Sequence, residues 1–158
     1  MTKITSKISD TFKVKAMQWC SKRECCRKEV FEKAVSWGCS LAEARDLVDF
    51  LVEQKFVDER RYTEAFVRDK LRFNKWGRVK IAYMIRTQDI DRSILMDALS
   101  EIDETEYFQI LTGELQKKCK TVRGVNDYET KGKLFHFAAG RGFEPEIINE
   151  AISKMMGT

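Results

Sequence analysis

Proline, glycine and histidine are scarce in this chain, whose 158 residues include one proline, eight glycines and one histidine. Proline and glycine interrupt regular secondary structure, so their scarcity argues against many short strands and favours long helices. The chain has no run of about 18 apolar residues, the length that a membrane-spanning helix requires. Residues 1–14 lack the apolar segment of a signal peptide, and we expect none. Hydrophobic residues nevertheless make up 43% of the sequence, which excludes a disordered chain.

The sequence also lacks the motifs of common catalytic and metal sites. Its five cysteines include no C-x-x-C pair, whereas zinc ligands are typically two to four residues apart. The single histidine, His136, has no nucleophile or carboxylate motif near it, and the common nucleotide-binding, serine-hydrolase and zinc-protease motifs are absent. An odd number of cysteines without a secretory signal is typical of reduced thiols in the cytosol. We therefore expect a cytoplasmic protein that is not an enzyme and that holds neither a cofactor nor a metal ion.

Charged residues are abundant, at 34% of the chain, and the 29 basic side chains outnumber the 25 acidic ones. The isoelectric point of about 8.8 lies below that of a dedicated nucleic-acid-binding domain. The charges are arranged in blocks of alternating sign. Basic blocks cover residues 13–33, 59–80 and 116–133, and acidic blocks cover residues 43–59 and 97–106. Any single block is compatible with a solvated helix face, but the regular alternation requires a further explanation.

An internal repeat organises the chain. Three segments that begin at Val30, Ile81 and Leu134 align without gaps, and apolar residues recur in the same columns. The spacing between these segments is 51 residues and then 53 residues. Each segment has a turn between two helical halves, where a residue that tolerates a left-handed backbone is favoured. The turn residues are Gly38, Asp89 and Gly142.

Helix-start signals follow each of the three turns. Ser40 and Glu43 have the spacing of a capping box. Asp91 is a good N-cap, and Pro145 suits the first turn of a helix. One more amphipathic helix is expected ahead of each copy, so that a repeat comprises three helices in about 50 residues. These additional helices are expected over residues 12–20, 61–73 and 107–116.

The sequence thus predicts an all-α fold, an elongated and curved array of three tandem three-helix repeats. The repeats are expected to cover residues 11–58, 59–105 and 106–158. Residues 1–10 are expected to form a flexible tail, and residues 119–130 are expected to form a loop. We expect the protein to be a monomer.

Six basic residues crowd into thirteen positions of the second repeat, with two aromatic residues among them. The basic residues are Arg68, Lys70, Arg72, Lys75, Arg78 and Lys80, and the aromatic residues are Phe73 and Trp76. A basic helix face beside an exposed aromatic ring suits contact with phosphates and stacking of bases. It also suits docking on an acidic protein surface. Alternatively, the aromatic residues belong to the core and the charges are only solvated. Arg141 is a further candidate, either for a helix cap or for contact with a partner.

Three stretches of the sequence form a recognisable set: residues 56–68, which begin Phe-Val-Asp-Glu-Arg-Arg-Tyr, residues 75–81 and residues 140–148. This set resembles the bacterial RecX family, whose members regulate the RecA recombinase, and the resemblance extends over residues 12–156. It implies three tandem three-helix repeats without catalytic residues. It also implies binding to the RecA–single-stranded-DNA filament, in or along its groove. Through this binding the family inhibits strand exchange, ATP hydrolysis and co-protease activity in DNA repair and the SOS response.

The resemblance and the charge pattern together assign roles to two groups of residues. Residues expected to contact RecA or DNA are Arg68, Lys70, Arg72, Lys75, Trp76, Arg78, Lys80 and Arg141. Signature residues expected to be structural are Asp58, Arg61, Tyr62, Phe66, Gly77, Gly142 and Phe143. Asp58 and Arg61 are expected to form a local pair that joins the first two repeats.

The sequence departs from the family pattern in two places. Thr63 stands where the family usually has alanine, which weakens a small-residue packing contact. Gln88 and Asp89 replace the usual Lys-Gly at the turn of the second repeat. The second departure places a side chain at a left-handed position, at a cost of about 1 kcal/mol.

Two other functions stay open on the sequence alone. One is a free-standing nucleic-acid-binding helical repeat protein, because two helices joined by a turn superficially resemble helix-turn-helix units. The helix expected after Ser40, however, carries four acidic residues that DNA would repel. These residues are Glu43, Asp46, Asp49 and Glu53. The other function is that of a scaffold that binds only proteins.

Overall fold

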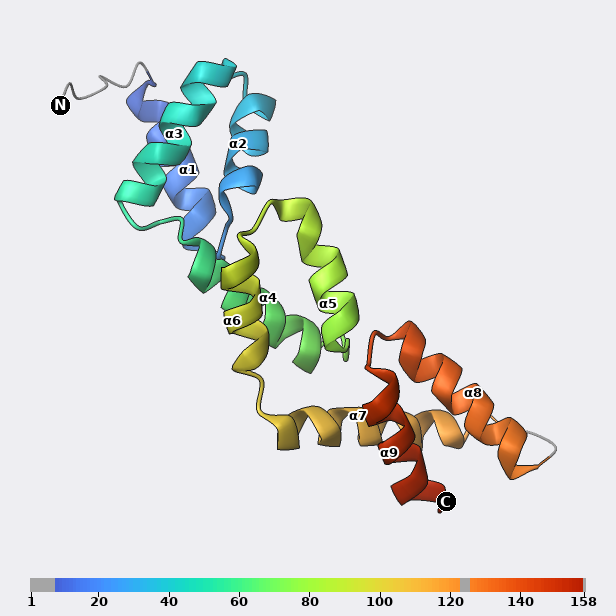
Figure 1. Cartoon of the computed structure of the whole chain (residues 1–158). Coiled ribbons are helices and arrows are strands. Elements are labelled where there is room, and N and C mark those ends of the chain that lie inside the picture. The colour runs from blue at the N-terminus through green and yellow to red at the C-terminus, as the bar shows by residue number, and fades with distance from the viewer. Residues whose placement is uncertain (1–7, 123–125, 158) are drawn as a thin grey trace. The chain divides into compact units, whose positions relative to one another are not determined.

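The computed structural model of the protein describes residues 8–122 and 126–157, and their regular structure is entirely helical (Figure 1). The helices are α1 (Asp10–Ser21), α2 (Arg27–Ser36), α3 (Leu41–Glu53), α4 (Glu59–Arg72), α5 (Arg78–Ile85), the 3-10 turn η1 (Arg86–Gln88), α6 (Arg92–Ser100), α7 (Glu104–Cys119), α8 (Asp127–Gly140) and α9 (Pro145–Met156). The all-α prediction is confirmed, and the helices occur in the expected order. Within the described ranges, no helix has the length and apolar character needed to cross a membrane.

Local sequence signals set the starts of the helices that follow the three turns. The Ser40 hydroxyl accepts a hydrogen bond from the N–H of Glu43 at 3.1 Å, and the Glu43 carboxylate accepts one from the N–H of Ser40 at 2.8 Å. The Asp91 carboxylate accepts a hydrogen bond from the N–H of Ser93 at 2.8 Å, and Pro145 occupies the first turn of α9. Each signal satisfies or removes a backbone donor that a helix start leaves without a partner.

The three expected turn residues all have left-handed backbone conformations. The φ angle is 101° at Gly38, 91° at Gly142 and 55° at Asp89. Glycine adopts this conformation without a steric penalty. Asp89 therefore bears the strain of about 1 kcal/mol that the sequence predicts for a side chain at this turn.

The start of the described chain differs from the expected flexible tail over residues 1–10. Ile8 is buried in a hydrophobic cluster, and Ser9 caps α1 by accepting a hydrogen bond from the N–H of Phe12. Ordered structure therefore begins within the expected tail, because an apolar anchor and a good N-cap lie there. The rest of that tail, residues 1–7, lies outside the described residues.

The connection between α7 and α8 is shorter than the loop expected over residues 119–130. Helix α7 continues through Cys119, and α8 begins at Asp127. The Asn126 side chain caps α8 by accepting a hydrogen bond from the N–H of Glu129 at 2.9 Å. Asparagine favours both loops and helix caps, and here it acts as a cap. Residues 123–125 lie outside the described residues.

The chain divides into two compact units. The first comprises Met1–Ala65 and Gln88–Ile94, and the second comprises Phe66–Thr87 and Leu95–Thr158. Helix α4 contributes residues to both units, as does α6. The boundaries of the three repeats thus stay a prediction, because these units divide the chain within α4.

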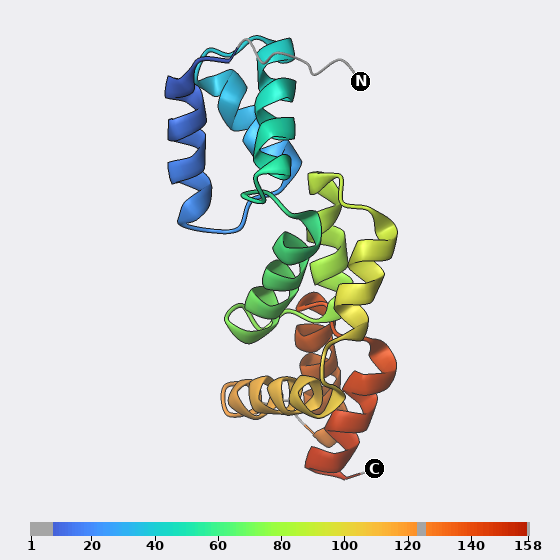
Figure 2. The same ribbon diagram turned by 90° about the vertical axis from the view of Figure 1, so that its left-hand side faces the viewer.

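The core of the first unit lies between α1, α2 and α3, which contact one another and lie side by side (Figure 2). Ala34 from α2 and Leu47 and Leu51 from α3 are fully buried there. Four cysteines of this unit are buried, and all five cysteines of the chain are free thiols. These four cysteines act as small apolar side chains in the core, as the sequence predicts.

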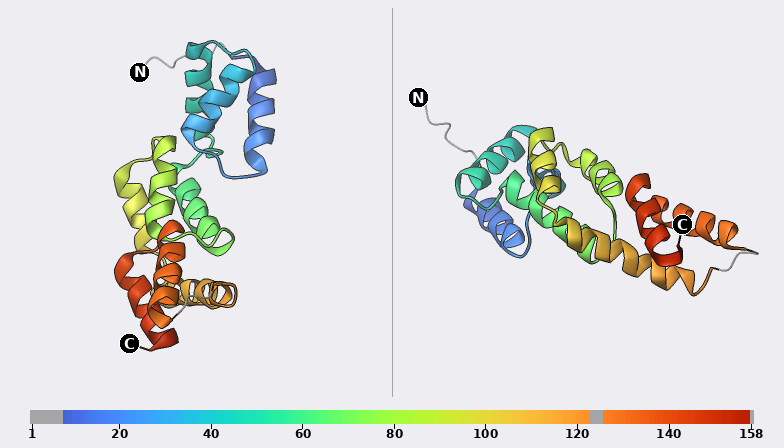
Figure 3. Two further views of the ribbon diagram at one scale, coloured as in Figure 1. Left: turned by 90° about the vertical axis from the view of Figure 1, so that its right-hand side faces the viewer. Right: turned by 60° about the horizontal axis from the view of Figure 1, so that its bottom comes forward.

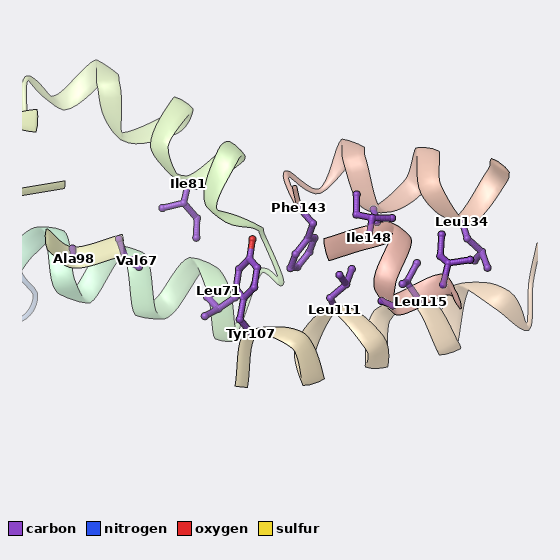
Figure 4. Packing of buried hydrophobic residues seen from close by; sticks show 13 residues of the cluster. Val67, Leu71, Ile81, Ala98, Tyr107, Leu111, Leu115, Leu134, Phe143 and Ile148 are labelled. Carbon is purple, nitrogen blue, oxygen red and sulfur yellow. The ribbon is translucent and has the colours of Figure 1, made fainter. Parts of the chain in front are cut away.

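Helix α7 provides the central row of the core in the second unit. Tyr107, Leu111 and Leu115 recur every four residues along it and are fully buried. Helices α8 and α9 both contact α7 and each other (Figure 3). They place Leu134 and Ile148 against this row (Figure 4). Phe143 is buried, with its ring centroid 5.2 Å from that of Tyr107.

Candidate nucleic-acid interface

Two glycines of the sequence signature, Gly77 and Gly142, lie in direct backbone contact in the second unit. The N–H of Gly77 donates to the carbonyl of Arg141 at 2.8 Å, and the N–H of Val79 donates to the carbonyl of Gly142 at 3.0 Å. A Cβ atom at Gly77 would lie 2.4 Å from the carbonyl oxygen of Gly142. A Cβ atom at Gly142 would lie 2.3 Å from the Cβ of Lys80. The turn between α8 and α9 therefore caps the first turn of α5, and both positions require glycine.

Arg78, the first residue of α5, is bound into the interior of this unit. Its guanidinium donates to Glu144 at 2.9 Å, pairs with Glu104 and lies 4.0 Å from the ring centroid of Tyr107. The Tyr107 hydroxyl accepts a hydrogen bond from the N–H of Arg78 at 2.9 Å and donates one to Glu144. Burial and the bond to Glu144 raise the pKa of Tyr107, so the phenol stays neutral. With its side chain only 17% exposed, Arg78 fits a structural role better than the expected contact with a partner.

The other arginines of the predicted site also lie beside carboxylates of the second unit. Arg72 forms two hydrogen bonds with Glu106, at 2.8 and 3.2 Å. Arg141 lies 3.5 Å from Glu114, and Arg68 lies 3.6 Å from the aspartate that follows it. The pairs of Arg72 and Arg68 are largely exposed and contribute little stability, whereas Glu114 beside Arg141 is only 13% exposed. All three carboxylates offset the positive charge that a phosphate would meet.

The three lysines of the predicted site are arranged differently from the arginines. Lys70 and Lys80 place their Nζ atoms 5.1 and 4.7 Å from the ring centroid of Trp76, and Lys70 also lies 5.4 Å from the ring of Phe66. Lys75 lies in the turn between α4 and α5 with a φ angle of 58°. Within the described residues, none of these three lysines forms an ion pair with a carboxylate. Their charge is therefore available to an outside anion.

The two aromatic residues between the lysines have different environments. Phe73 is 79% exposed, whereas Trp76 is half-buried against the core of the second unit. The sequence left the core and surface alternatives open for both residues, and the structure divides them. An exposed ring in the same segment as several lysines suits stacking of a nucleobase while the lysines meet phosphates. We call Lys70, Phe73, Lys75, Trp76 and Lys80 the Trp76 surface.

The start of α4 positions the other signature residues. The Asp58 carboxylate accepts a hydrogen bond from the N–H of Arg61 at 2.9 Å, whereas the Arg61 guanidinium pairs with Glu24 at 2.7 Å. The expected Asp58–Arg61 pair is therefore a helix cap, and the ion-pair partner is Glu24, 37 residues earlier. Tyr62 is buried, which raises its pKa. Thr63 is also buried and donates its hydroxyl to a backbone carbonyl at 2.7 Å, so this departure from alanine is accommodated.

The first unit holds a second group of aromatic rings and cations that sequence reasoning missed. Trp19 and Trp37 pack edge to face, and three basic side chains lie over their rings. The sequence signal for this group is the basic block over residues 13–33, which contains Trp19 and ends four residues before Trp37. Among the residues that the structure describes, no cluster of His, Cys, Asp and Glu is arranged to hold a metal ion.

Comparison with known protein families matches two segments of the chain. Residues 58–99 match the second three-helix domain of RecX, and residues 104–152 match the third. Regulatory protein RecX of Clostridium tetani is 27% identical over 143 residues, which cover 89% of this chain and 65% of that protein. Regulatory protein RecX of Chlorobium phaeobacteroides is 27% identical over 140 residues, which cover 89% of this chain and 90% of that protein. The chain thus spans slightly less than two thirds of the clostridial protein and most of the other.

Two solved structures share the fold of this chain. The crystal structure of RecX from Lactobacillus salivarius aligns with a TM-score of 0.80 and 19% sequence identity, covering 92% of this chain and 95% of that one. A crystal structure of regulatory protein RecX aligns with a TM-score of 0.78 and 16% identity, covering 89% of this chain and 72% of that one. At these identities the likeness concerns the fold alone.

Proposed function

Because the chain belongs to the RecX family, we propose that it binds the RecA–single-stranded-DNA filament and regulates RecA, mainly by inhibition. The activities affected are strand exchange, ATP hydrolysis and co-protease activity, in DNA repair and the SOS response. The match of two successive three-helix domains to this family of regulatory proteins is the observation on which the proposal depends. The free thiols of the chain favour a reducing compartment, and we place the protein in the cytoplasm.

The Trp76 surface supports contact with the DNA of such a filament. Its three lysines lack carboxylate partners within the described residues, and Phe73, three residues after Lys70 and two before Lys75, presents an exposed ring. Ammonium groups attract phosphates without reading sequence, and an aromatic face stacks on any base. Sequence-independent contact is what a regulator of a filament on arbitrary DNA requires.

Helix α5 supports contact with a protein at the same place. It exposes Val79, Tyr83 and Met84 on its surface, next to Lys80 of the Trp76 surface. Exposed apolar side chains that gather on one short helix are typical of a protein-contact surface. A site that combines phosphate-binding lysines with apolar side chains is suited to a partner composed of both protein and DNA.

The acidic surface of α3 argues against the alternative of a free-standing DNA reader. Helix α3 follows a turn, as a recognition helix does, but Asp49 and Glu53 are exposed on it. DNA phosphates would repel these carboxylates in the major groove. A role that depends on major-groove recognition is therefore disfavoured.

The direct test measures ATP hydrolysis by RecA on single-stranded DNA while this protein is added. We expect turnover to fall at less than one molecule of the protein per RecA subunit. No change at any ratio would contradict the proposal.

A salt titration of binding to single-stranded DNA without RecA addresses the alternatives. Tight binding with a steep salt dependence would favour the free-standing DNA-binding protein, and no binding would favour a protein-only scaffold.

A further inference from the structure

Trp19 of α1 and Trp37 at the end of α2 form a compact aromatic pair in the first unit. Their ring centroids lie 6.4 Å apart, and their planes are inclined by 83°. Arg23 and Lys33 lie 4.7 and 5.7 Å from the ring centroid of Trp19. Lys15 lies 4.8 Å from that of Trp37. We call these five residues the Trp19–Trp37 cluster.

The charges around this cluster are predominantly positive. Arg23 has a carboxylate partner, Glu29, at 3.4 Å. Lys15 and Lys33 form no ion pair within the part of the chain that the structure describes. Lys13 extends the row of cations along α1, with its Nζ 4.8 Å from the ring of Phe50. The one further acidic side chain near Lys33 in sequence is that of the exposed Glu32.

The cluster is built like the Trp76 surface of the second unit. In both places a half-buried indole packs against the hydrophobic core of its unit. In both places lysine ammonium groups also lie over an indole ring. In both places those lysines lack carboxylate partners among the described residues. The cation–ring contacts hold the ammonium groups near the rings without neutralising them. An incoming strand therefore meets positive charge and an aromatic surface together.

We propose that the Trp19–Trp37 cluster is a second contact site for single-stranded nucleic acid, located in the first unit and outside residues 58–152. The class of ligand rests on the proposed function, whereas the location rests on this cluster alone. Lys15 and Lys33 turn from the rings toward the phosphates of the strand, and a base stacks on the indole surface that they leave. With one such site in each unit, the chain has two contacts for single-stranded nucleic acid, and loss of either one should lower its affinity.

Tryptophan fluorescence tests the two sites separately, because the chain has only Trp19, Trp37 and Trp76. In full-length Trp76→Phe, all tryptophan emission comes from the cluster. In the double variant W19F/W37F, all of it comes from the Trp76 surface. We expect oligothymidylate to quench the emission of Trp76→Phe at low salt. The quenching should weaken as salt is added, with a slope that reports the number of phosphate contacts.

Charge removal assigns the quenching to the cluster. In the Trp76→Phe background, the variants Lys15→Gln and Lys33→Gln combined should weaken binding at least about fivefold and lower the salt slope by roughly 0.7 for each lysine. Lys22→Gln is the matched control, since Lys22 is exposed at the end of α1 and contacts neither indole ring. It should leave binding unchanged. Thermal unfolding by circular dichroism verifies that each variant is folded.

The outcomes separate this inference from the proposed function. Quenching of W19F/W37F without quenching of Trp76→Phe overturns the second site and leaves the RecA proposal standing. Quenching that survives loss of Lys15 and Lys33 also overturns it. Anisotropy of a labelled oligothymidylate with the lysine variants in the wild-type background gives a second readout that needs no tryptophan substitution. An unchanged affinity and salt slope there would indicate that the cluster binds an acidic protein surface or only packs the core.

Discussion

The guanidinium of Arg78 donates a hydrogen bond of 2.9 Å to the carboxylate of Glu144, which lies 66 residues later in the chain. The same carboxylate accepts the hydroxyl of the fully buried Tyr107. The three side chains form one network between α5, α7 and the start of α9. Loss of any one of them removes a partner from the others in a partly buried setting, where an incompletely satisfied polar group is costly.

Replacing Arg78 by glutamine should therefore destabilise the protein. We expect a loss of about 1–3 kcal/mol in the free energy of unfolding, because Glu144 keeps its charge without its cationic partner. Arg72→Gln is the matched control, since the Arg72–Glu106 pair is exposed and should contribute much less. Urea denaturation of both variants measures the difference. Equal losses would contradict the structural role of Arg78.

The lysines and the arginines among residues 68–80 should contribute differently to binding. Replacing Lys70, Lys75 and Lys80 by glutamine should weaken inhibition of RecA and lower the salt slope of binding to single-stranded DNA by roughly 0.7 for each lysine. Replacing Arg68 and Arg72 by glutamine should change both quantities less, because these arginines already pair with carboxylates. Dose–response curves for RecA ATP hydrolysis measure the first quantity. If the arginine variant is the more impaired of the two, the assignment of the Trp76 surface is wrong.

The contact between Gly77 and Gly142 should tolerate no side chain. Gly142→Ala combines a φ angle of 91° with a Cβ that would lie 2.3 Å from that of Lys80, and we expect it to cost more than about 2 kcal/mol. Gly140→Ala, at the end of α8, adds a Cβ with no atom within 4 Å and should be neutral or stabilising. Thermal unfolding distinguishes the two variants. A stable Gly142→Ala protein would show that the two backbones can separate without loss of the fold.

Alkaline pH should destabilise the protein through its buried tyrosines. Burial raises the pKa of Tyr62 and of Tyr107 above the usual value, so folding favours their neutral forms. The contribution of these two buried phenols to stability is complete below the unfolded pKa of about 10 and is lost as the pH rises through the raised pKa values.

Tyr107→Phe should cost about 1–2 kcal/mol at neutral pH through lost hydrogen bonds. Its stability should then fall less steeply than that of the wild type above pH 10. Urea denaturation across this pH range compares the two slopes, and parallel curves would contradict the argument.

Features that depend on neighbours in sequence could be predicted for this chain. The capping box of Ser40 and Glu43 and the left-handed turn at Asp89 are set within a few residues, so periodicity and residue type were sufficient. The acidic partners of Arg72 and Arg78 lie 26 to 66 residues away in sequence, and no local pattern indicates them. The charge pattern therefore identified the basic cluster but could not separate its available lysines from its paired arginines.

The surroundings of the aromatic residues could not be predicted from local sequence patterns either. Phe73 and Trp76 lie three residues apart in one basic segment, yet only tertiary packing decides that one is exposed and the other half-buried. Trp19 and Trp37 come together because α1 and α2 pack against each other, and their 18-residue separation carries no recognisable motif. Composition located the basic blocks, and the fold decided which rings accompany them.

The backbone bonds from Gly77 and Val79 to the turn between α8 and α9 have a consequence for folding. The family domains divide the chain between residues 99 and 104, but these bonds cross that division. A fragment that ends before α7 would leave the first turn of α5 without its caps and Tyr107 absent from the core. The part of the second family domain that lies in the second unit, residues 66–87 and 95–99, should therefore unfold together with the third domain and not separately from it.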